Sequence, residues 1–383
     1  MARALYIHWP FCLAKCPYCD FNSHVRSSVD EDLWERALLA DLRFEAECAG
    51  NEPLESVFFG GGTPSLMPPR IVARLLEEAE RLWGFSPRIE ITLEANPSSV
   101  EAANFAALAV AGVNRVSLGL QALHDEQLRF LGRLHDVAEG LNAVETAQNA
   151  FARINIDLIY ALAGQHIKAW QRDLHHAIEF GTDHMALYQL TIEPGTRFAT
   201  MVRTGEFAPM NDDEAADFYT LTAETMIDAG LPWYETSNYS RPGQESRHNL
   251  TYWRYHDYVG IGPGAHGRRG GFATTRHRKP ENWLAAVQRN GSGLQEERAL
   301  GANEQASEAL LMGLRLREGI DPAELAGRFG MAADNMLDMR EVDRLLASEH
   351  LKREGERLRV TVDGMLVLNA LLPRLVSDAL IEA

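Results

Sequence analysis

The feature that most limits the fold is a regular alternation of short β-rich runs and amphipathic helical stretches over the first half of the chain. Two of the helical stretches open with a capping-box pattern, at Ser28–Glu31 and Ser98–Glu101. Strands that are joined by helices pair in parallel through right-handed crossovers. The expected strands are Leu5–Trp9, Ser56–Phe59, Ile89–Ala95, Arg115–Leu120, Ile154–Tyr160 and His184–Thr191.

Two architectures fit this alternation, an open doubly wound sheet and a barrel or partial barrel. No Gly-x-Gly-x-x-Gly follows the first expected strand, which disfavours a dinucleotide-binding sheet. Polar or glycine-rich residues follow several different strands instead, and barrels carry their active sites at these strand ends. We therefore expect an α/β fold with a partial (β/α)6 barrel of the TIM type.

The alternation ends near residue 200, and the next part of the chain has a mixed pattern. It contains a helical stretch at Asp213–Ala229, a strand-like run at Trp233–Thr236 and a glycine-rich run at Val259–His266. We expect three parts: a barrel over 1–200, an extension over 201–290 and a C-terminal domain over 291–383.

The expected C-terminal domain combines helices with a short β-like piece, Arg357–Val362, which predicts a small winged-helix-like α+β domain. Such a shape suggests DNA binding, but residues 291–383 carry 11 Lys/Arg against 17 Asp/Glu, and the whole chain has a formal net charge of −17. Nucleic-acid binding requires a basic surface. We therefore expect no nucleic-acid partner, and a domain that packs on the barrel as a lid.

Three of the four cysteines, Cys12, Cys16 and Cys19, form a C-x3-C-x2-C run directly after the first expected strand. Three thiolates can hold three irons of a [4Fe–4S] cluster and leave the fourth iron open to a substrate or cofactor. A Cys3His zinc site that uses His8 or His24 is the alternative, as are three cysteines without a joint role.

The fourth cysteine, Cys48, ends a helical pattern that includes Trp34, Leu38, Leu42 and Ala46, so we expect it to be a buried, small apolar residue. No apolar run approaches the ~18 residues that a membrane span needs. We expect a cytoplasmic protein, in a reducing compartment that keeps thiols available. Any contact with the inner membrane would be peripheral.

The cysteine run resembles the cluster loop of the radical S-adenosylmethionine (SAM) superfamily. The resemblance implies that the amino and carboxylate groups of SAM chelate the open iron. It also implies that Tyr18, just before the last cysteine, packs near the adenine. The same superfamily has the partial (β/α)6 barrel that the alternation predicts.

A glycine-rich turn, Gly60-Gly61-Gly62-Thr63-Pro64, follows the second expected strand. Glycines allow the backbone to approach a ligand closely. The turn resembles the superfamily motif that receives the SAM amino group, which implies that Gly61, Gly62 and Thr63 contact SAM. An ordinary β–α turn is the alternative, and the absence of a following lysine disfavours a P-loop.

Four more polar residues fall at or near the ends of expected strands, and Tyr6 lies on the first strand. A carboxylate can accept hydrogen bonds from an ammonium or ribose hydroxyl, and an arginine can pair with a carboxylate. Each could also be an ordinary polar residue. Together they resemble the SAM-contact positions of the coproporphyrinogen dehydrogenase-like branch of the superfamily, and they are Tyr6, Glu94, Gln121, Arg133 and Asp157.

Longer stretches of the sequence, spread over nearly the whole chain, resemble those of the haem chaperones of this branch. The dehydrogenases of the branch carry a fourth cysteine two residues after the third, where this chain has Phe21, and an extension ahead of the cluster loop. The resemblance implies a protein without dehydrogenase activity that transfers haem to acceptor proteins, including membrane-bound respiratory enzymes, and that dimerises. Decarboxylation of coproporphyrinogen III is the alternative function.

The stretch His248-Asn-Leu-Thr-Tyr-Trp253 matches the HNxxYW motif that the resemblance connects with haem. If it is helical, His248 and Tyr252 share one face. An imidazole can be an axial ligand of haem iron, and aromatic rings can pack against the macrocycle. We therefore expect His248 to bind haem. A hydrogen-bonded histidine on a packed helix is the alternative.

Overall fold

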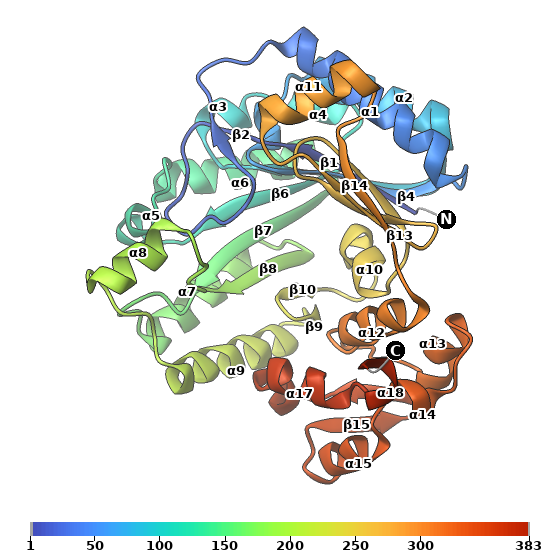
Figure 1. Cartoon of the computed structure of the whole chain (residues 1–383). Coiled ribbons are helices and arrows are strands. Elements are labelled where there is room, and N and C mark those ends of the chain that lie inside the picture. Colours follow the sequence, from blue (N-terminus) through green and yellow to red (C-terminus); the bar gives the residue numbers. More distant parts are fainter. Residues whose placement is uncertain (1–2, 382–383) are drawn as a thin grey trace.

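A twelve-stranded mixed sheet organises the chain, and the computed structural model describes residues 3–381 of it (Figure 1). The strand order is β14-β13-β12-β11-β1-β4-β5-β6-β7-β8-β10-β9. The six expected strands are its consecutive, parallel centre, as the alternation predicted. They are β1 (Ala4–Trp9), β4 (Leu54–Gly61), β5 (Phe85–Ala95), β6 (Arg115–Gln121), β7 (Arg153–Tyr160) and β8 (His184–Gln189).

The parallel register brings the loops after these strands to one edge of the sheet. In the β1–β4 pair, His8 lies opposite Gly60 and Trp9 lies opposite Gly61. The cluster loop after β1 therefore lies beside the glycine-rich turn after β4. This edge is where a barrel fold builds its active site.

The helices that join the parallel strands lie outside the curved sheet (Figure 1) and bury their apolar faces against it. Of the two predicted helix caps, one is confirmed and one is wrong. Ser98 caps α3 (Ser99–Ala102), as expected, but α1 begins after Asp30 rather than at Ser28, because the Asp30 carboxylate accepts the Leu33 N–H at 3.0 Å. The main outer helices are α1 (Glu31–Ala49), α2 (Pro69–Trp83), α6 (Val137–Ala150) and α7 (Ile167–Glu179).

Cys48 is exposed, so the expectation of a buried cysteine was wrong. A helix turns by about 100° per residue, so a four-residue spacing advances about 40° with each step. The buried stripe of α1 instead includes Trp34, Leu38, Glu45 and Ala49, which leaves Cys48 beside it in solvent.

The later segments lengthen the sheet at both edges. After β8 come α8 (Arg197–Thr204) and α9 (Asp212–Asp228), and then β9 and β10 add antiparallel strands beside β8. β11 pairs in parallel with β1, and β12 to β14 follow it as antiparallel strands. The bounds are β9 (Trp233–Glu235), β10 (Asn238–Ser240), β11 (Tyr258–Ile261), β12 (His266–Arg269), β13 (Phe272–Arg276) and β14 (Leu294–Ala299).

The HNxxYW stretch forms a short helix, α10 (Arg247–Trp253), on the concave side of the sheet (Figure 1). The C-terminal part packs below it and has the expected α+β character, with a β15–β16 hairpin among helices. No helix within residues 3–381 is long and apolar enough to cross a bilayer. The C-terminal elements are α12 (Ala302–Gly313), α13 (Pro322–Arg328), α14 (Ala333–Met336), α15 (Met339–Ala347), β15 (Leu351–Glu354), β16 (Arg357–Val360), α16 (Val362–Leu366), α17 (Leu368–Leu375) and α18 (Asp378–Ile381).

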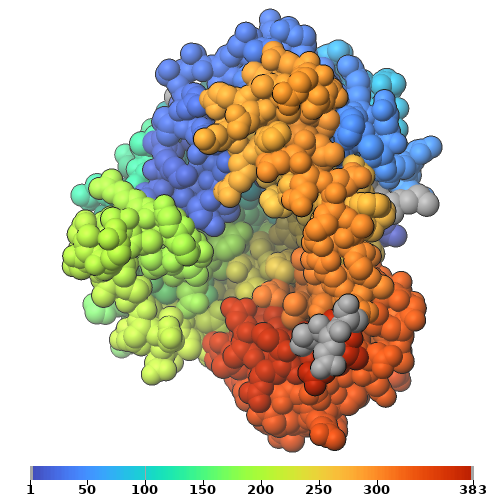
Figure 2. Space-filling model, in the orientation of Figure 1, coloured from blue at the N-terminus to red at the C-terminus, as the bar shows by residue number. Residues whose placement is uncertain are grey.

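The molecule is hollowed on the face that Figure 2 shows. The blue N-terminal segments, the green α8 region, the orange extension and the red C-terminal helices surround the hollow. Chain segments that are far apart in the sequence thus border the concave side of the sheet.

Candidate cofactor site at the carboxyl ends of the barrel strands

The three cysteines of the cluster loop lie together after β1. The Cys19 N–H donates to the Cys16 carbonyl at 3.1 Å, which forms a tight turn. Each thiol has a polar neighbour: Thr63 Oγ1 at 3.4 Å from Cys12 Sγ, Arg133 Nη1 at 3.4 Å from Cys16 Sγ and Ser23 Oγ at 3.7 Å from Cys19 Sγ. Such donors around the thiolates tune an iron–sulfur cluster.

The three thiols of the cluster loop do not gather around one point. Within residues 3–381, no three His, Cys, Asp or Glu side chains converge closely enough to hold one ion. In a cluster, each cysteine binds a different iron, so the thiols need not converge.

The glycine-rich turn lies very close to the start of the cluster loop, and only glycine leaves room for this approach. A side chain at Gly62 would lie 2.7 Å from the Phe11 carbonyl, directly before Cys12. The Gly61 N–H donates to Glu94 Oε2 at 3.2 Å, and Gly61 has a φ of +117°. The turn thus brings together the cluster loop and the end of β5.

Arg133 connects the cluster loop with two strand ends. Its guanidinium donates to Cys16 Sγ and Tyr18 Oη, both at 3.4 Å, to the Gly119 carbonyl at 3.0 Å and to Asn96 Oδ1. Asn96 also donates to Thr63 Oγ1 at 3.2 Å. Sequence reasoning missed Asn96, although its position directly after the third expected strand is the same signal that identified Glu94.

Two buried polar atoms at this edge have no hydrogen-bond partner among the described residues. They are Arg133 Nε and Gln121 Oε1, and both side chains border Gly119. Buried polar groups without partners are uncommon in proteins and require an explanation. A polar cofactor such as SAM would supply the missing partners, so these residues fit the group.

Two carboxyl groups face each other across this edge of the barrel. Burial, and then the nearby charge of Asp157, raises the pKa of Glu94 to about 8. Burial raises the pKa of Asp157 to about 6, against the opposing hydrogen bonds from Asn155 and Ser117. Both groups would be stabilised as carboxylates by a cation, because an opposite charge favours the ionised form.

A cavity of about 420 Å³ opens beside these groups and joins the expected SAM residues to the HNxxYW helix. Tyr6, Gly61 and Glu94 line it together with Tyr252 of α10. A second cavity, of about 730 Å³, borders Cys16, Cys19 and several basic residues. Twelve of the thirteen expected residues, all but His248, therefore contact or border this edge. They are Cys12, Cys16, Cys19, Tyr6, Tyr18, Gly61, Gly62, Thr63, Glu94, Gln121, Arg133 and Asp157.

His248 lies deeper than expected and is 2% exposed. Its Nδ1 is 2.9 Å from Ser56 Oγ, its Nε2 is 2.6 Å from Tyr252 Oη, and its ring stacks on Phe58 at 4.9 Å. Burial lowers the pKa of His248 to about 3, so the ring is neutral. This is the geometry of the packed, hydrogen-bonded alternative.

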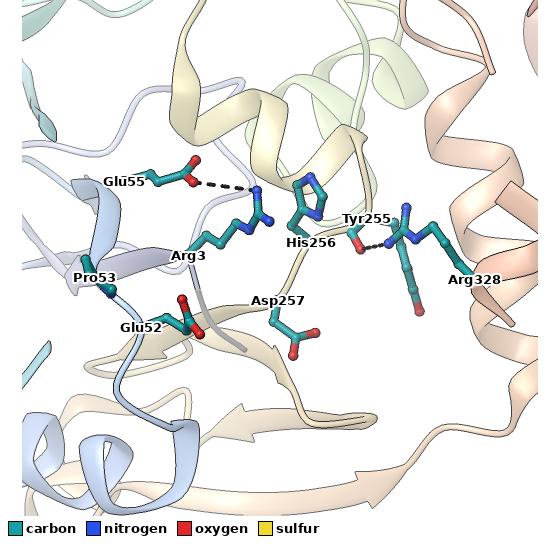
Figure 3. Close-up of a pocket in the computed structure, with 8 residues that line it drawn as sticks. All are labelled: Arg3, Glu52, Pro53, Glu55, Tyr255, His256, Asp257 and Arg328. Carbon is teal, nitrogen blue, oxygen red and sulfur yellow. Dashed lines mark hydrogen bonds and ion pairs between the residues drawn. The ribbon is translucent and has the colours of Figure 1, made fainter. Parts of the chain in front are cut away.

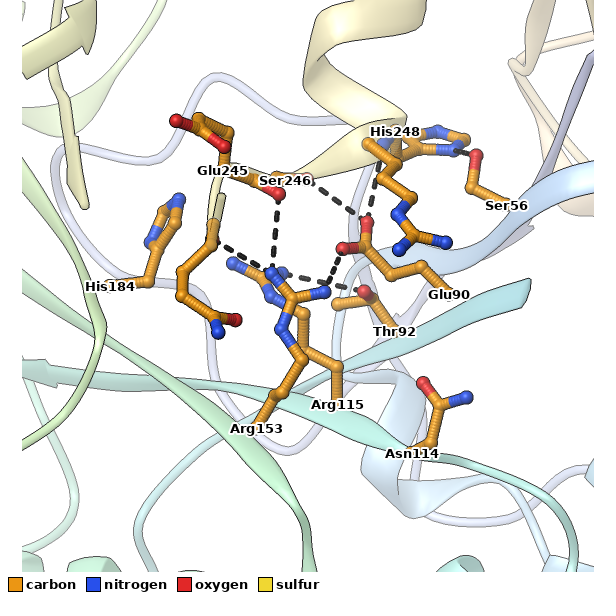
Figure 4. Close-up of polar contacts among 12 residues, drawn as sticks. Ser56, Glu90, Thr92, Asn114, Arg115, Arg153, His184, Glu245, Ser246 and His248 are labelled. Atoms are coloured by element: carbon orange, nitrogen blue, oxygen red, sulfur yellow. Dashed lines mark hydrogen bonds and ion pairs between the residues drawn. The ribbon is translucent and has the colours of Figure 1, made fainter. Parts of the chain in front are cut away.

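A buried polar network holds the start of α10 (Figure 4). Glu90 of β5 accepts from the His248 N–H at 3.2 Å and from Ser246 Oγ at 3.3 Å, and it pairs with Arg153 at 2.6 Å. Arg153 also donates to the Gln244 carbonyl at 2.7 Å. The helix is therefore fixed to the barrel wall.

A further polar cavity, of about 390 Å³, lies at the opposite ends of β1 and β4 (Figure 3). Arg3 pairs there with Glu55 at 3.5 Å, and Arg328 of α13 donates to the Tyr255 carbonyl at 2.8 Å. The Arg328 contact attaches the C-terminal part to the chain that follows α10.

Comparison with known proteins identifies the family. Residues 6–177 match the radical SAM superfamily, and residues 300–367 match the HemN C-terminal domain. The chain is 36% identical over 378 residues to the heme chaperone HemW of Escherichia coli K12, covering 96% of this chain and 97% of that protein. The chain belongs to the HemW family of radical SAM proteins. Mitochondrial radical S-adenosyl methionine domain-containing protein 1 of Mus musculus is 38% identical over 387 residues, covering 96% of this chain and 86% of that protein.

The fold of this HemW-family chain is also that of a solved relative. The structure of Escherichia coli coproporphyrinogen III oxidase, HemN, superposes with a TM-score of 0.82 at 20% identity, covering 97% of this chain and 89% of that one. The expected radical SAM fold with an added C-terminal domain is confirmed. Membership of the superfamily implies a [4Fe–4S] cluster and SAM.

Proposed function

We propose that this chain is a haem chaperone that binds a [4Fe–4S] cluster, SAM and haem, and transfers haem to acceptor proteins, including membrane-bound respiratory enzymes. The observation that carries the proposal is the 36% identity to the heme chaperone HemW along nearly the whole length of both chains. Tyr252, which lines the same cavity as Glu94, supports a connection between the HNxxYW helix and the cofactor edge.

In this proposal the cluster loop and the strand ends hold the two cofactors. Cys12, Cys16 and Cys19 bind the cluster, and Tyr18 packs near the adenine. When bound, the cluster and SAM supply one-electron chemistry that protein side chains cannot perform. The residues that bind and orient SAM are Tyr6, Gly61, Gly62, Thr63, Glu94, Gln121, Arg133 and Asp157.

The three parts of the chain have separate roles in this proposal. Residues 1–200 carry the cluster and SAM, residues 201–290 carry the HNxxYW helix with His248 as part of the haem site, and residues 291–383 cover the barrel. We further propose a cytoplasmic homodimer with peripheral contact to the inner membrane and no nucleic-acid partner. The net charge of −17 supports the last point.

An anaerobic haem titration of the cluster-reconstituted protein, followed by absorbance, tests the proposal. We expect saturable binding that weakens in His248→Ala, and transfer of the bound haem to an acceptor protein from which haem has been removed. Binding that does not saturate, or haem that stays on the chain in the presence of a competent acceptor, would contradict it.

Coproporphyrinogen III decarboxylation is the second candidate function, and the match of residues 300–367 to the HemN C-terminal domain is the observation behind it. Phe21 stands against it, since the dehydrogenases carry a fourth cysteine at that position. Anaerobic incubation of the reconstituted protein with coproporphyrinogen III, SAM and a reductant separates the two. The chaperone proposal expects no protoporphyrinogen to form.

A further inference from the structure

The 420 Å³ cavity at the cofactor edge contains a second, unassigned imidazole. Two histidines line this cavity, His8 and His266. Both ring nitrogens of His8 are engaged, Nδ1 with Tyr6 Oη at 3.0 Å and Nε2 with the Asn22 carbonyl at 2.9 Å. His266, at the start of β12, is exposed, and its ring makes no hydrogen bond within residues 3–381.

His248 does not reach the cavity itself. Tyr252 lies between them, since its hydroxyl is 2.6 Å from His248 Nε2 while its side chain lines the cavity. To bind an iron, His248 would have to lose its contacts with Ser56 and Tyr252 and leave a site where it is 2% exposed. Leaving such buried partners unpaired is unfavourable.

We propose that His266 is the axial ligand of haem iron at the exposed side of this cavity, which leaves Tyr6, Gly61 and Glu94 to SAM. His266, Phe21 and Arg278 are all exposed on that side. His248 is then a positioning residue that acts through Tyr252. The inference rests on the proposed haem-chaperone function and names the ligand and the site. An exposed imidazole nitrogen that faces a cavity can donate its lone pair to iron without breaking an existing contact.

The other walls of the cavity suit a haem. Tyr252 and Tyr258 pack edge to face, with ring centroids 4.5 Å apart, and Phe21 is 63% exposed at the opening. Aromatic faces and edges are the surfaces on which a macrocycle packs. Arg278 also lines the cavity, and a guanidinium can bind a propionate carboxylate in a bidentate manner.

The haem ligand would be connected directly to the cluster loop. Asn22, three residues after Cys19, donates to the carbonyls of Pro263 at 2.8 Å and Arg278 at 2.9 Å. A side chain at Gly264 would lie 2.5 Å from Asn22 Nδ2, so only glycine fits there. The turn that presents His266 therefore depends on the position of the cluster loop.

The test is a haem titration of the cluster-reconstituted full chain, read by absorbance and electron paramagnetic resonance. The variants are His266→Ala, His266→Met and His248→Ala, with His175→Ala on the surface of α7 as the matched control. We expect His266→Ala to weaken haem binding by about tenfold or more, to change the axial-ligand spectrum and to recover that spectrum with added imidazole.

His266→Met replaces one axial ligand with another, so we expect haem binding to persist with a different spectrum. His248→Ala should lower the affinity and keep the wild-type spectrum, because it acts through Tyr252. Two results would overturn the inference and leave the chaperone proposal standing. In the first, His266→Ala binds haem with the affinity and spectrum of the wild type. In the second, His248→Ala loses the axial-ligand spectrum and is the only variant in which added imidazole restores it. A wild-type chain that binds no haem would overturn both.

Discussion

Two glutamates on one strand illustrate how this barrel separates a ligand site from a structural site. Glu90 and Glu94 lie four residues apart on β5, so both point to the same face of the sheet. Burial would raise the pKa of Glu90, but the charges of Arg115 and Arg153, together with backbone N–H groups at the start of α10, lower it. Burial and Asp157 raise the pKa of Glu94 to about 8.

The difference lies in the partners. Glu90 pairs with Arg153 and accepts from Ser246 Oγ and the His248 N–H, so its charge is fully used by the protein. Among the residues that the structure describes, Glu94 accepts one N–H, from Gly61. A carboxylate with complete partners holds a fold together, whereas one that lacks them is suited to receive a cation.

The largest expected effect is the loss of the cluster on the side of the barrel where Glu94 lies. We expect Cys16→Ser to abolish a stable [4Fe–4S] cluster, because only two protein ligands remain in the loop. Iron and sulfide analysis after reconstitution, with the visible absorbance, measures the loss. Cys48→Ser is the matched control, since Cys48 is exposed on α1 and should leave the cluster content unchanged. Full cluster occupancy in Cys16→Ser would contradict the assignment.

The second prediction tests the structural role of Glu90. Glu90→Gln leaves the charges of Arg153 and Arg115 without their carboxylate, so we expect the free energy of unfolding to fall by about 3 kcal/mol. Denaturant unfolding at pH 7 measures it, with hydrogen exchange in α10 as a local readout. If Glu90→Gln were as stable as the wild type, the network would not hold the helix.

The sequence predicted the six central strands because each is a short apolar run between helical patterns, and their parallel order followed from the connections. It also predicted a [4Fe–4S] cofactor, which membership of the superfamily implies, since three closely spaced cysteines need no tertiary information to be recognised; that Cys12, Cys16 and Cys19 bind it stays a prediction. Cys48 was misplaced because a four-residue spacing is only an approximation to the helical repeat. The added strands β11 to β14 could not be predicted from the sequence, because the pairing of β11 with β1, and of each later strand with the strand before it, decides their structure.

The environment of His248 could not be predicted either. Its two ring partners include Ser56, which is 192 residues away in the sequence, and its backbone partner Glu90 is 158 residues away. Spacing within the HNxxYW motif correctly placed His248 and Tyr252 on one face of a helix. Which of them reaches a cavity depends on the wall against which that helix packs.

The third effect concerns Glu94 and depends on pH. A folded-state pKa near 8, above the ordinary 4.5, means that the ligand-free fold loses stability as the pH rises from about 4.5 to 8. We expect Glu94→Gln to be more stable than the wild type at pH 8, on the order of 2 kcal/mol, and nearly equal to it at pH 4.5. Thermal unfolding at the two pH values measures this.

The same substitution should weaken SAM binding. Ionisation of Asp157 near pH 6 and Glu94 near pH 8 should strengthen wild-type binding of the SAM cation as the pH rises between these values. Glu94→Gln should reduce the affinity by about tenfold at pH 8 and flatten the pH profile. An unchanged SAM affinity in calorimetric titration would show that Glu94 does not receive the cofactor.

The smallest effect asks whether the Glu90 network and the start of α10 form one unit. Ser246 caps α10 by accepting the Asn249 N–H at 3.3 Å and donates to Glu90 at 3.3 Å, so Ser246→Ala should cost about 1 kcal/mol. In a double-mutant cycle with Glu90→Gln, the two losses should sum to more than the double variant loses, by at least about 0.5 kcal/mol. Asn211→Ala removes the cap of α9 and should add independently to Glu90→Gln. If the loss in stability from Ser246→Ala adds to that from Glu90→Gln as fully as the loss from Asn211→Ala does, Glu90 stabilises the barrel wall without holding the start of α10.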